Sequence, residues 1–178
     1  MLDGVETNTG VYVSATNTGT NPNFADADGD NDGLVDAVED KIGTDKTKAD
    51  TDGDILLDGV ETNTGTWASL NSTGTDPKKP DSDGDGLQDD VETYNWAYQS
   101  NTKVGTNPNK SDTDGDGLND KVETGTGTWL SATNTGTYAN DKDSDDDGLD
   151  DNVETGTGTW VSASKTGSNP NKPDTDGD

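Results

Sequence analysis

The chain has 178 residues, of which 24% are hydrophobic and 28% charged, and its 38 acidic and 11 basic residues give a net charge of −27. So few apolar side chains cannot offset the entropy that the chain loses on folding, and an ordered fold therefore needs free energy from another source. Bound cations can supply it, and the negative charge of the chain attracts them. The sequence contains no His or Cys, which excludes zinc–thiolate sites, disulfides and imidazole catalysis. All basic residues are Lys and the net charge is strongly negative, which argues against nucleic acid as a partner. No apolar run is long enough for membrane insertion.

The positions of the Glu residues reveal an internal repeat. Successive Glu residues are 33, 22, 31, 31 and 31 residues apart, which indicates a basic unit of 31 residues with one insertion and one deletion. Every Glu ends the same motif, whose clearest copy occupies 81–92 and reads D-x-D-x-D-G-L-x-D-x-V-E. The six Glu residues are Glu6, Glu39, Glu61, Glu92, Glu123 and Glu154.

The motif is complete five times and partial at both ends of the sequence. Residues 1–6 match its second half and residues 174–178 its first half. The complete copies occupy 28–39, 50–61, 81–92, 112–123 and 143–154. We therefore expect residues 1–178 to form one repeat array that is a fragment of a longer chain.

Connectors rich in Thr and Gly follow the motifs, and each is predicted to form two short strands around a turn. They occupy 7–20, 62–75, 93–106, 124–137 and 155–168. After Glu39 this hairpin is missing, so it is dispensable to the acidic motif. The predicted fold is an elongated linear array, mostly irregular, with short β-hairpins, little hydrophobic core and no long helices beside the motifs.

The connectors carry aromatic and hydroxyl side chains whose roles the sequence leaves open. Trp67, Trp129 and Trp160 fall six positions after a Glu, and we expect them to pack within or between units, with stacking on sugars as the alternative. The Thr side chains are expected on exposed strands, with O-glycosylation and ice binding as alternatives. Asn71 and Asn109 begin triplets that fit N-glycosylation.

The acidic motif matches the calcium loop of an EF-hand in its spacing. Calcium takes about six to eight oxygen ligands, and alternate residues of a tight loop can all point inward while a Glu at position 12 closes the shell with both oxygens. Gly at position 6 permits the positive φ of the turn. One such loop is often a solvated linker, but five complete copies with identical acid spacing favour calcium binding.

The predicted ligands are Asp at positions 1, 3 and 5, the carbonyl of Leu at position 7, Asp at position 9 directly or through water, and Glu at position 12. In the complete motifs they are Asp28, Asp30, Asp32, Leu34, Asp36 and Glu39; Asp50, Asp52, Asp54, Leu56, Asp58 and Glu61; Asp81, Asp83, Asp85, Leu87, Asp89 and Glu92; Asp112, Asp114, Asp116, Leu118, Asp120 and Glu123; and Asp143, Asp145, Asp147, Leu149, Asp151 and Glu154. The partial motifs add Asp3, Glu6, Asp174, Asp176 and Asp178.

Charge sets the expected number of ions. Five carboxylates exceed the charge of one calcium, so we expect at least one ion in each of the five complete loops. The remaining charge is either screened by solvent or neutralised by a second ion, which would give about two ions per repeat. Five ions would reduce the net charge from −27 to −17, and ten would reduce it to −7.

Two positions in the motif invite specific expectations. Ile55 stands where the other loops have Gly, so a positive φ there would be strained, and we expect that loop to be weaker or differently bent. Leu87 and Val91 are four residues apart, so they can share one face of a helical turn at the loop exit and pack on the nearby aromatic residue as a miniature core.

Residues 107–118 resemble the thrombospondin type 3 repeat of the Cys-free bacterial kind, with the run N-P-x-x-x-D-T-D-G-D-G-L. The resemblance covers the loops and their Pro-containing lead-ins, not the Thr-rich hairpins. It implies a calcium-wrapped chain with almost no core, two ions sharing a repeat, and a role as a stalk in a secreted or surface-bound protein. The layout is also similar to that of calcium adhesins linked to cell walls, whereas an EF-hand sensor or a dockerin would need flanking helices.

We therefore expect a calcium-binding structural protein outside the cell, a rigid spacer or the body of a filament, with neighbouring repeats or further copies as partners. No enzyme is expected, because the acids belong to repeated loops and no unique segment forms a cleft. The alternative is an adhesin whose Thr and Trp hairpins contact glycan, ice or a partner protein.

Overall fold

A computed structural model describes residues 8–9, 27–95, 97, 99–100 and 103–177. The chain divides into two compact units, of which unit 1 comprises Met1–Ser82 and Gln88–Asp90 and unit 2 comprises Asp83–Leu87 and Val91–Asp178. Asp3, Glu6 and Asp178 lie outside the described residues, as does nearly all of the connector expected at 7–20.

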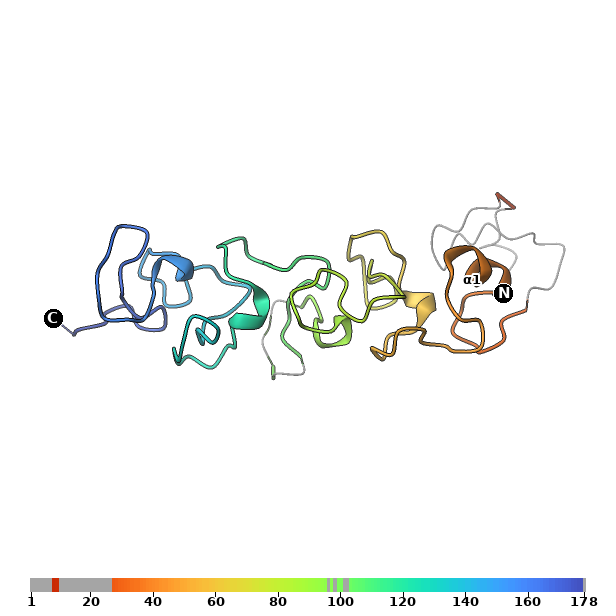
Figure 1. The fold of residues 1–178 in the computed structure, drawn as a ribbon, viewed down its shortest axis with the longest axis horizontal. Coiled ribbons are helices and arrows are strands. Elements are labelled where there is room, and N and C mark those ends of the chain that lie inside the picture. Colours follow the sequence, from red (N-terminus) through yellow and green to blue (C-terminus); the bar gives the residue numbers. More distant parts are fainter. Residues whose placement is uncertain (1–7, 10–26, 96, 98, 101–102, 178) are drawn as a thin grey trace. The chain divides into compact units, whose positions relative to one another are not determined.

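Regular secondary structure is sparse in both units, which confirms the expectation of a mostly irregular fold (Figure 1). The helix α1 spans Asp36–Ile42, and each later complete motif has only a single turn of 3-10 helix. These turns are η2 (Asp58–Val60), η3 (Asp89–Val91), η4 (Asp120–Val122) and η5 (Asp151–Val153). The helical turn expected at the loop exit is thus present in each of the five complete motifs.

The helix α1 is longer than the other turns because apolar residues continue past its motif. Ile42 follows Val38 by one helical turn, whereas each of the other Glu residues is followed by Thr, which is a poor helix former. α1 ends at Gly43, whose φ of 83° gives a left-handed cap. Lys78 Nζ donates a 2.7 Å hydrogen bond to the Ile42 carbonyl, which binds the later chain to this end of the helix.

The apolar core is confined to the same place. Leu34, Val35 and Val38 are buried together, and Ile42 packs against them. In the rest of the described chain only Ala139 is a buried hydrophobic residue. The miniature core expected in each repeat is therefore found, among the described residues, only beside α1. The Leu and Val residues at positions 7 and 11 of the other complete motifs are half-buried.

The connectors double back as expected, but among the described residues they form isolated bridges and no strands. In connector 62–75 the Gly65 N–H donates to the Gly74 carbonyl at 2.9 Å, and the tip closes with a bridge between Ser69 and Ser72. Gly65 and Gly74 have φ values of 66° and 79°, and this left-handed conformation interrupts an extended strand.

The aromatic side chains of the connectors differ in their surroundings. Trp129 is half-buried, and its ring lies so close to Gly156 of the next connector that a Cβ at Gly156 would overlap the ring. Trp160 is 70% exposed. The expectation that the aromatic residues pack within or between repeats therefore fits Trp129 and not Trp160.

No helix in the part of the chain that the structure describes has both the length and the apolar character to cross a bilayer.

Candidate metal centres

Backbone N–H groups of the acidic loops hold the first carboxylate of each motif in place. Asp50 Oδ1 accepts a hydrogen bond from Gly53 N–H at 2.6 Å, and Oδ2 accepts one from Ile55 N–H at 2.9 Å. Asp112 is held in the same way by Gly115 and Gly117 at 2.7 and 3.0 Å. The side chain therefore folds over its own loop, which requires the tight turn at positions 4–6.

The turn explains the residues at position 6. Gly117 has a φ of 101°, and Ile55 has a φ of 86° despite its β-branched side chain. The loop at 50–61 therefore keeps the same bend as the Gly loops, and the expectation that it would bend differently is wrong. The Ile55 side chain is 76% exposed, so little packing offsets the strain of its backbone.

The carboxylates at positions 3 and 5 turn into the loop. Asp52 Oδ1 accepts a hydrogen bond from Asp54 N–H at 3.3 Å, and Asp54 Oδ1 accepts one from Leu56 N–H at 2.8 Å. Each carboxylate thus has one oxygen fixed by the backbone. Asp52 Oδ2 and Asp54 Oδ2 are buried without a hydrogen-bond partner.

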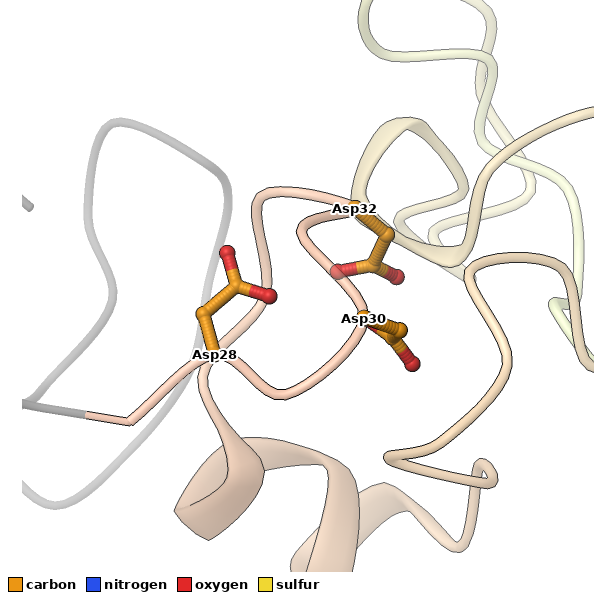
Figure 2. A group of neighbouring side chains, drawn as sticks. All are labelled: Asp28, Asp30 and Asp32. Carbon is orange, nitrogen blue, oxygen red and sulfur yellow. The ribbon is translucent and has the colours of Figure 1, made fainter.

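The acids at positions 1, 3 and 5 form one group in each loop of unit 1. One carboxylate oxygen from each of Asp28, Asp30 and Asp32 lies within 4.8 Å of the others. Figure 2 shows these side chains on one tight loop, with the carboxylates of Asp28 and Asp32 directed toward one another. Asp50, Asp52 and Asp54 form the equivalent group in the next loop. The structure therefore brings these predicted ligands together.

A second type of acidic group joins two successive motifs. Asp32 and Glu39, at positions 5 and 12 of one motif, lie within 4.8 Å of Asp58, at position 9 of the next, and all three are buried. The next such group consists of Asp54, Glu61 and Asp89. We call these the joint clusters. Asp58 and Asp89 thus face the preceding motif, whereas the EF-hand spacing predicted that position 9 would serve its own loop.

The residue at position 2 orients the Asp at position 9. Asp58 accepts hydrogen bonds from both the backbone N–H and the hydroxyl of Thr51, at 2.8 and 2.6 Å. The same pair of bonds joins Ser82 to Asp89, Thr113 to Asp120 and Ser144 to Asp151. In the first complete motif, where position 2 is Gly29, Asp36 accepts only the backbone bond, at 2.9 Å.

Unit 2 repeats the approach of one motif to the next. The Asn152 N–H donates a 3.1 Å hydrogen bond to Asp116 Oδ2, so the exit of motif 143–154 lies against position 5 of motif 112–123. Burial raises the pKa of Glu123 to about 9, and the charges of Asp116, Asp114 and Asp151 add to the effect. Asp151 therefore lies near the Glu of the preceding motif, as Asp58 does in unit 1.

Motif 81–92 is divided between the units. Asp81 and Asp89 belong to unit 1, and its other predicted ligands to unit 2. Within unit 2, burial raises the pKa of Glu92 to about 10, with contributions from Asp83, Asp85 and Asp120.

Burial without a counter-charge perturbs the acids of the joint clusters. It raises the pKa of Glu61 to about 9 and that of Asp54 to about 7, and the charges of neighbouring carboxylates act in the same direction. In the first joint cluster the pKa of Glu39 is raised to about 7 and that of Asp32 to about 6 for the same reasons. Carboxylates in such surroundings gain from a bound cation, because it replaces the water they have lost.

Buried threonines complete the surroundings of the Glu residues. The sequence had suggested that these threonines lie on exposed strands. Thr75 Oγ1 donates to Glu61 Oε1 at 2.9 Å, and Thr73 Oγ1 lies 2.6 Å from Thr75 Oγ1. The equivalent bond from Thr137 to Glu123 is 3.0 Å. The available signal was spacing, since each of these threonines follows its Glu by 14 residues.

The remaining predicted ligands are placed less specifically. Asp174 accepts a hydrogen bond from Gly177 N–H at 2.6 Å, as position 1 does in the complete motifs, and Asp176 is exposed. The Leu residues at position 7 donate their N–H groups to position 5, and the role of their carbonyl oxygens stays a prediction.

The donor set suits a hard divalent cation. The grouped atoms are carboxylate oxygens, with no nitrogen or sulfur donor, and several are buried without a partner: Asp30 Oδ1 and Oδ2, Asp32 Oδ2, Glu39 Oε1 and Oε2, Asp54 Oδ2 and Glu61 Oε2. Several Asp and Glu groups are therefore positioned to hold a metal ion. Comparison with protein families, with curated proteins and with solved structures finds no match.

Proposed function

We propose that this chain is a calcium-binding structural segment, an extracellular spacer or stalk built as a linear repeat array, whose folding depends on calcium. The observation that carries the proposal is the joint cluster, in which buried acids from two successive motifs meet without a basic side chain among them. An ion bound there would tie one motif to the next. Repeating this joint would stiffen the chain in place of a hydrophobic core.

Calcium fits the clusters better than magnesium. Magnesium requires a compact octahedral shell and keeps several of its waters, whereas calcium accepts larger and less regular sets of carboxylate oxygens. The position-5 acids Asp32 and Asp54 each belong to two groups, one within the loop and one at the joint. This supports about two ions per repeat, the number that the net charge favours.

The extracellular location is part of the proposal. Calcium there is on the order of millimolar, which would fill even weak sites of this kind. The resemblance of the loops to thrombospondin type 3 repeats agrees with a secreted or surface-bound stalk.

Small-angle scattering of the chain in millimolar calcium and in chelator tests the proposal. A compact globule of 178 residues would have a radius of gyration of about 16 Å and an unfolded chain one of about 45 Å. We expect a rod-like profile in calcium, distinct from both, and a loosened chain in chelator. Identical profiles in the two conditions would refute a calcium-dependent spacer.

A second candidate function is adhesion, because large apolar side chains are exposed at the connector turns. Leu70, Leu130, Trp160 and Val161 are 64–70% exposed. Replacing Trp160 with Ala distinguishes the candidates, since loss of attachment to glycan or ice surfaces with unchanged calcium binding would favour an adhesin. Unchanged attachment would leave the spacer as the better account.

A further inference from the structure

Two kinds of joint cluster can be distinguished by the hydrogen bonds of their Glu residue. In the Glu61 cluster, Oε1 accepts the Thr75 hydroxyl at 2.9 Å, and Oε2 is buried without a partner. Glu123 has the same arrangement with Thr137. In the Glu39 cluster, both carboxylate oxygens are buried without a partner. The same holds for Glu154, where Ser168 stands in the place of the threonine.

For Glu39 the difference follows from the length of its connector. Thr44 lies in a Gly-Thr-Asp sequence, as Thr75 does at the end of its longer connector, but Thr44 follows Glu39 by only five residues. Its hydroxyl is buried and makes no hydrogen bond. The nine-residue deletion therefore removes the hydroxyl donor from the Glu39 cluster and leaves both Glu oxygens without a hydrogen-bond partner.

The threonine that contacts Glu is held in one orientation. Thr137 Oγ1 has one proton, which it donates to Glu123 Oε1, and its oxygen lies 2.6 Å from Thr135 Oγ1, which contacts the Val122 carbonyl at 3.1 Å. Both threonines are buried. Glu92 accepts the same bond from Thr106 at 3.0 Å although Val104 stands in the place of the outer threonine, so the inner hydroxyl acts without it.

We infer that the inner threonines, Thr75, Thr106 and Thr137, are positioning residues that limit their Glu partner to one metal-facing oxygen, whereas Glu39 offers both. This inference rests on the proposed function and adds cation selectivity to it. A carboxylate that binds through both oxygens suits the large shell of calcium and does not suit the octahedron of magnesium. The Glu39 cluster should therefore discriminate more strongly between the two ions than the Glu61 and Glu123 clusters do.

The chain offers a direct probe for each cluster, because all six Glu residues stand at motif position 12. Labelling Glu with ¹³C at the side-chain carboxyl carbon gives one NMR signal per motif, assigned by single Glu→Gln variants. Titration of the metal-free, full chain with Ca²⁺ and separately with Mg²⁺ then gives two midpoints for each signal. In the unmodified chain, we expect the ratio of the Mg²⁺ midpoint to the Ca²⁺ midpoint to be about tenfold larger at Glu39 than at Glu61 or Glu123.

Thr137→Val removes the hydroxyl from Glu123 while keeping the side-chain shape, and Thr137→Ser restores the hydroxyl. In the Val variant, we expect the ratio at Glu123 to rise about tenfold toward that of Glu39, and in the Ser variant to stay at its original value. Thr135→Val is the matched control, since the natural Val104 shows that the outer hydroxyl is dispensable, and it should leave the ratio unchanged.

The outcomes separate this inference from the proposed function. Equal ratios at Glu39, Glu61 and Glu123 in the unmodified chain would overturn the inference even if Thr137→Val failed to fold. An equal loss of Ca²⁺ and Mg²⁺ affinity in Thr137→Val would also overturn it, because a merely structural hydroxyl would act on both ions alike. If no Glu signal responded to either ion, the proposed function itself would fail.

Discussion

The assignment of position 9 to the preceding motif can be tested by replacing Asp58 with Asn. The variant removes one charge from the cluster of Asp32, Glu39 and Asp58. Its amide oxygen can still accept the hydrogen bond from Thr51 N–H, which is 2.8 Å long, and its amide N–H can donate to the Thr51 hydroxyl. The loop around Asp58 should therefore keep its conformation.

The expected loss of calcium affinity is set by two opposing effects. Two unit charges 4.8 Å apart, the upper limit of separation in this cluster, interact by about 3 kcal/mol at an effective dielectric constant of 20. The substitution weakens attraction to the ion but also relieves repulsion from Asp32 and Glu39. The net loss should approach the value of one contact to a charged group, about 1.5–3 kcal/mol, or roughly 10- to 100-fold in the midpoint.

The ¹³C-Glu titration measures where this loss occurs. We expect the calcium midpoint of the Glu39 signal to rise by that factor and that of the Glu61 signal to change much less. Asp40→Asn is the matched control, because Asp40 carries the same charge but is exposed on α1 and pairs with Lys46 at 2.9 Å. A larger shift at Glu61 than at Glu39 would refute the reasoning, since position 9 would then serve its own loop.

Three further perturbations test the backbone, the packing and the ionisation of the fold. Ile55→Gly should stabilise the calcium-bound protein by about 1 kcal/mol in urea unfolding, because it relieves a positive φ, and Ile55→Ala should not. Gly156→Ala should destabilise it by about 2–4 kcal/mol, since it adds overlap with Trp129 to backbone strain, while Gly158→Ala, with open space around it, should show the strain alone. The pKa of Glu61 is raised from 4.5 to about 9 in the fold, so its stabilising contribution in the metal-free protein is complete below pH 4.5 and is lost as pH rises through 9. Thermal unfolding of metal-free protein should therefore show lower stability at pH 8 than at pH 5, and the opposite order would contradict the burial of Glu61.

The internal geometry of the loops was largely predictable from the sequence because it is local. The spacing of acids, the need for a positive φ at position 6 and the helical turn at the exit each depend on neighbouring residues. The conformation of Ile55 follows from the same logic, since the loop requires the bend whichever residue stands there. The expectation that this loop would bend differently was wrong, and the alternative expectation of weaker ion binding stays a prediction.

The contacts between motifs were not predictable in the same way. A repeat of Asp at position 9 is equally compatible with binding in its own loop and with binding in the loop before it, because each motif supplies the same residues. Thr75 was expected on an exposed strand because the Thr- and Gly-rich connector was predicted to form two short strands around a turn, but positive φ at Gly65 and Gly74 interrupts the strand. The constant spacing of 14 residues between Glu61 and Thr75 indicated a contact, but its meaning became clear only from the hydrogen bond between the two side chains.

The burial pattern also explains why a chain with so little apolar surface can be ordered. In the described part of the chain the buried hydrophobic residues are Leu34, Val35, Val38 and Ala139, while thirteen acidic side chains are buried. Buried carboxylates without a counter-charge destabilise a fold, so their number would be a defect in a protein that folds alone. If cations bind at the joints, the same acids become the principal source of folding free energy. The order of the chain would then follow the calcium concentration around it, and folding would be favoured where that ion is abundant.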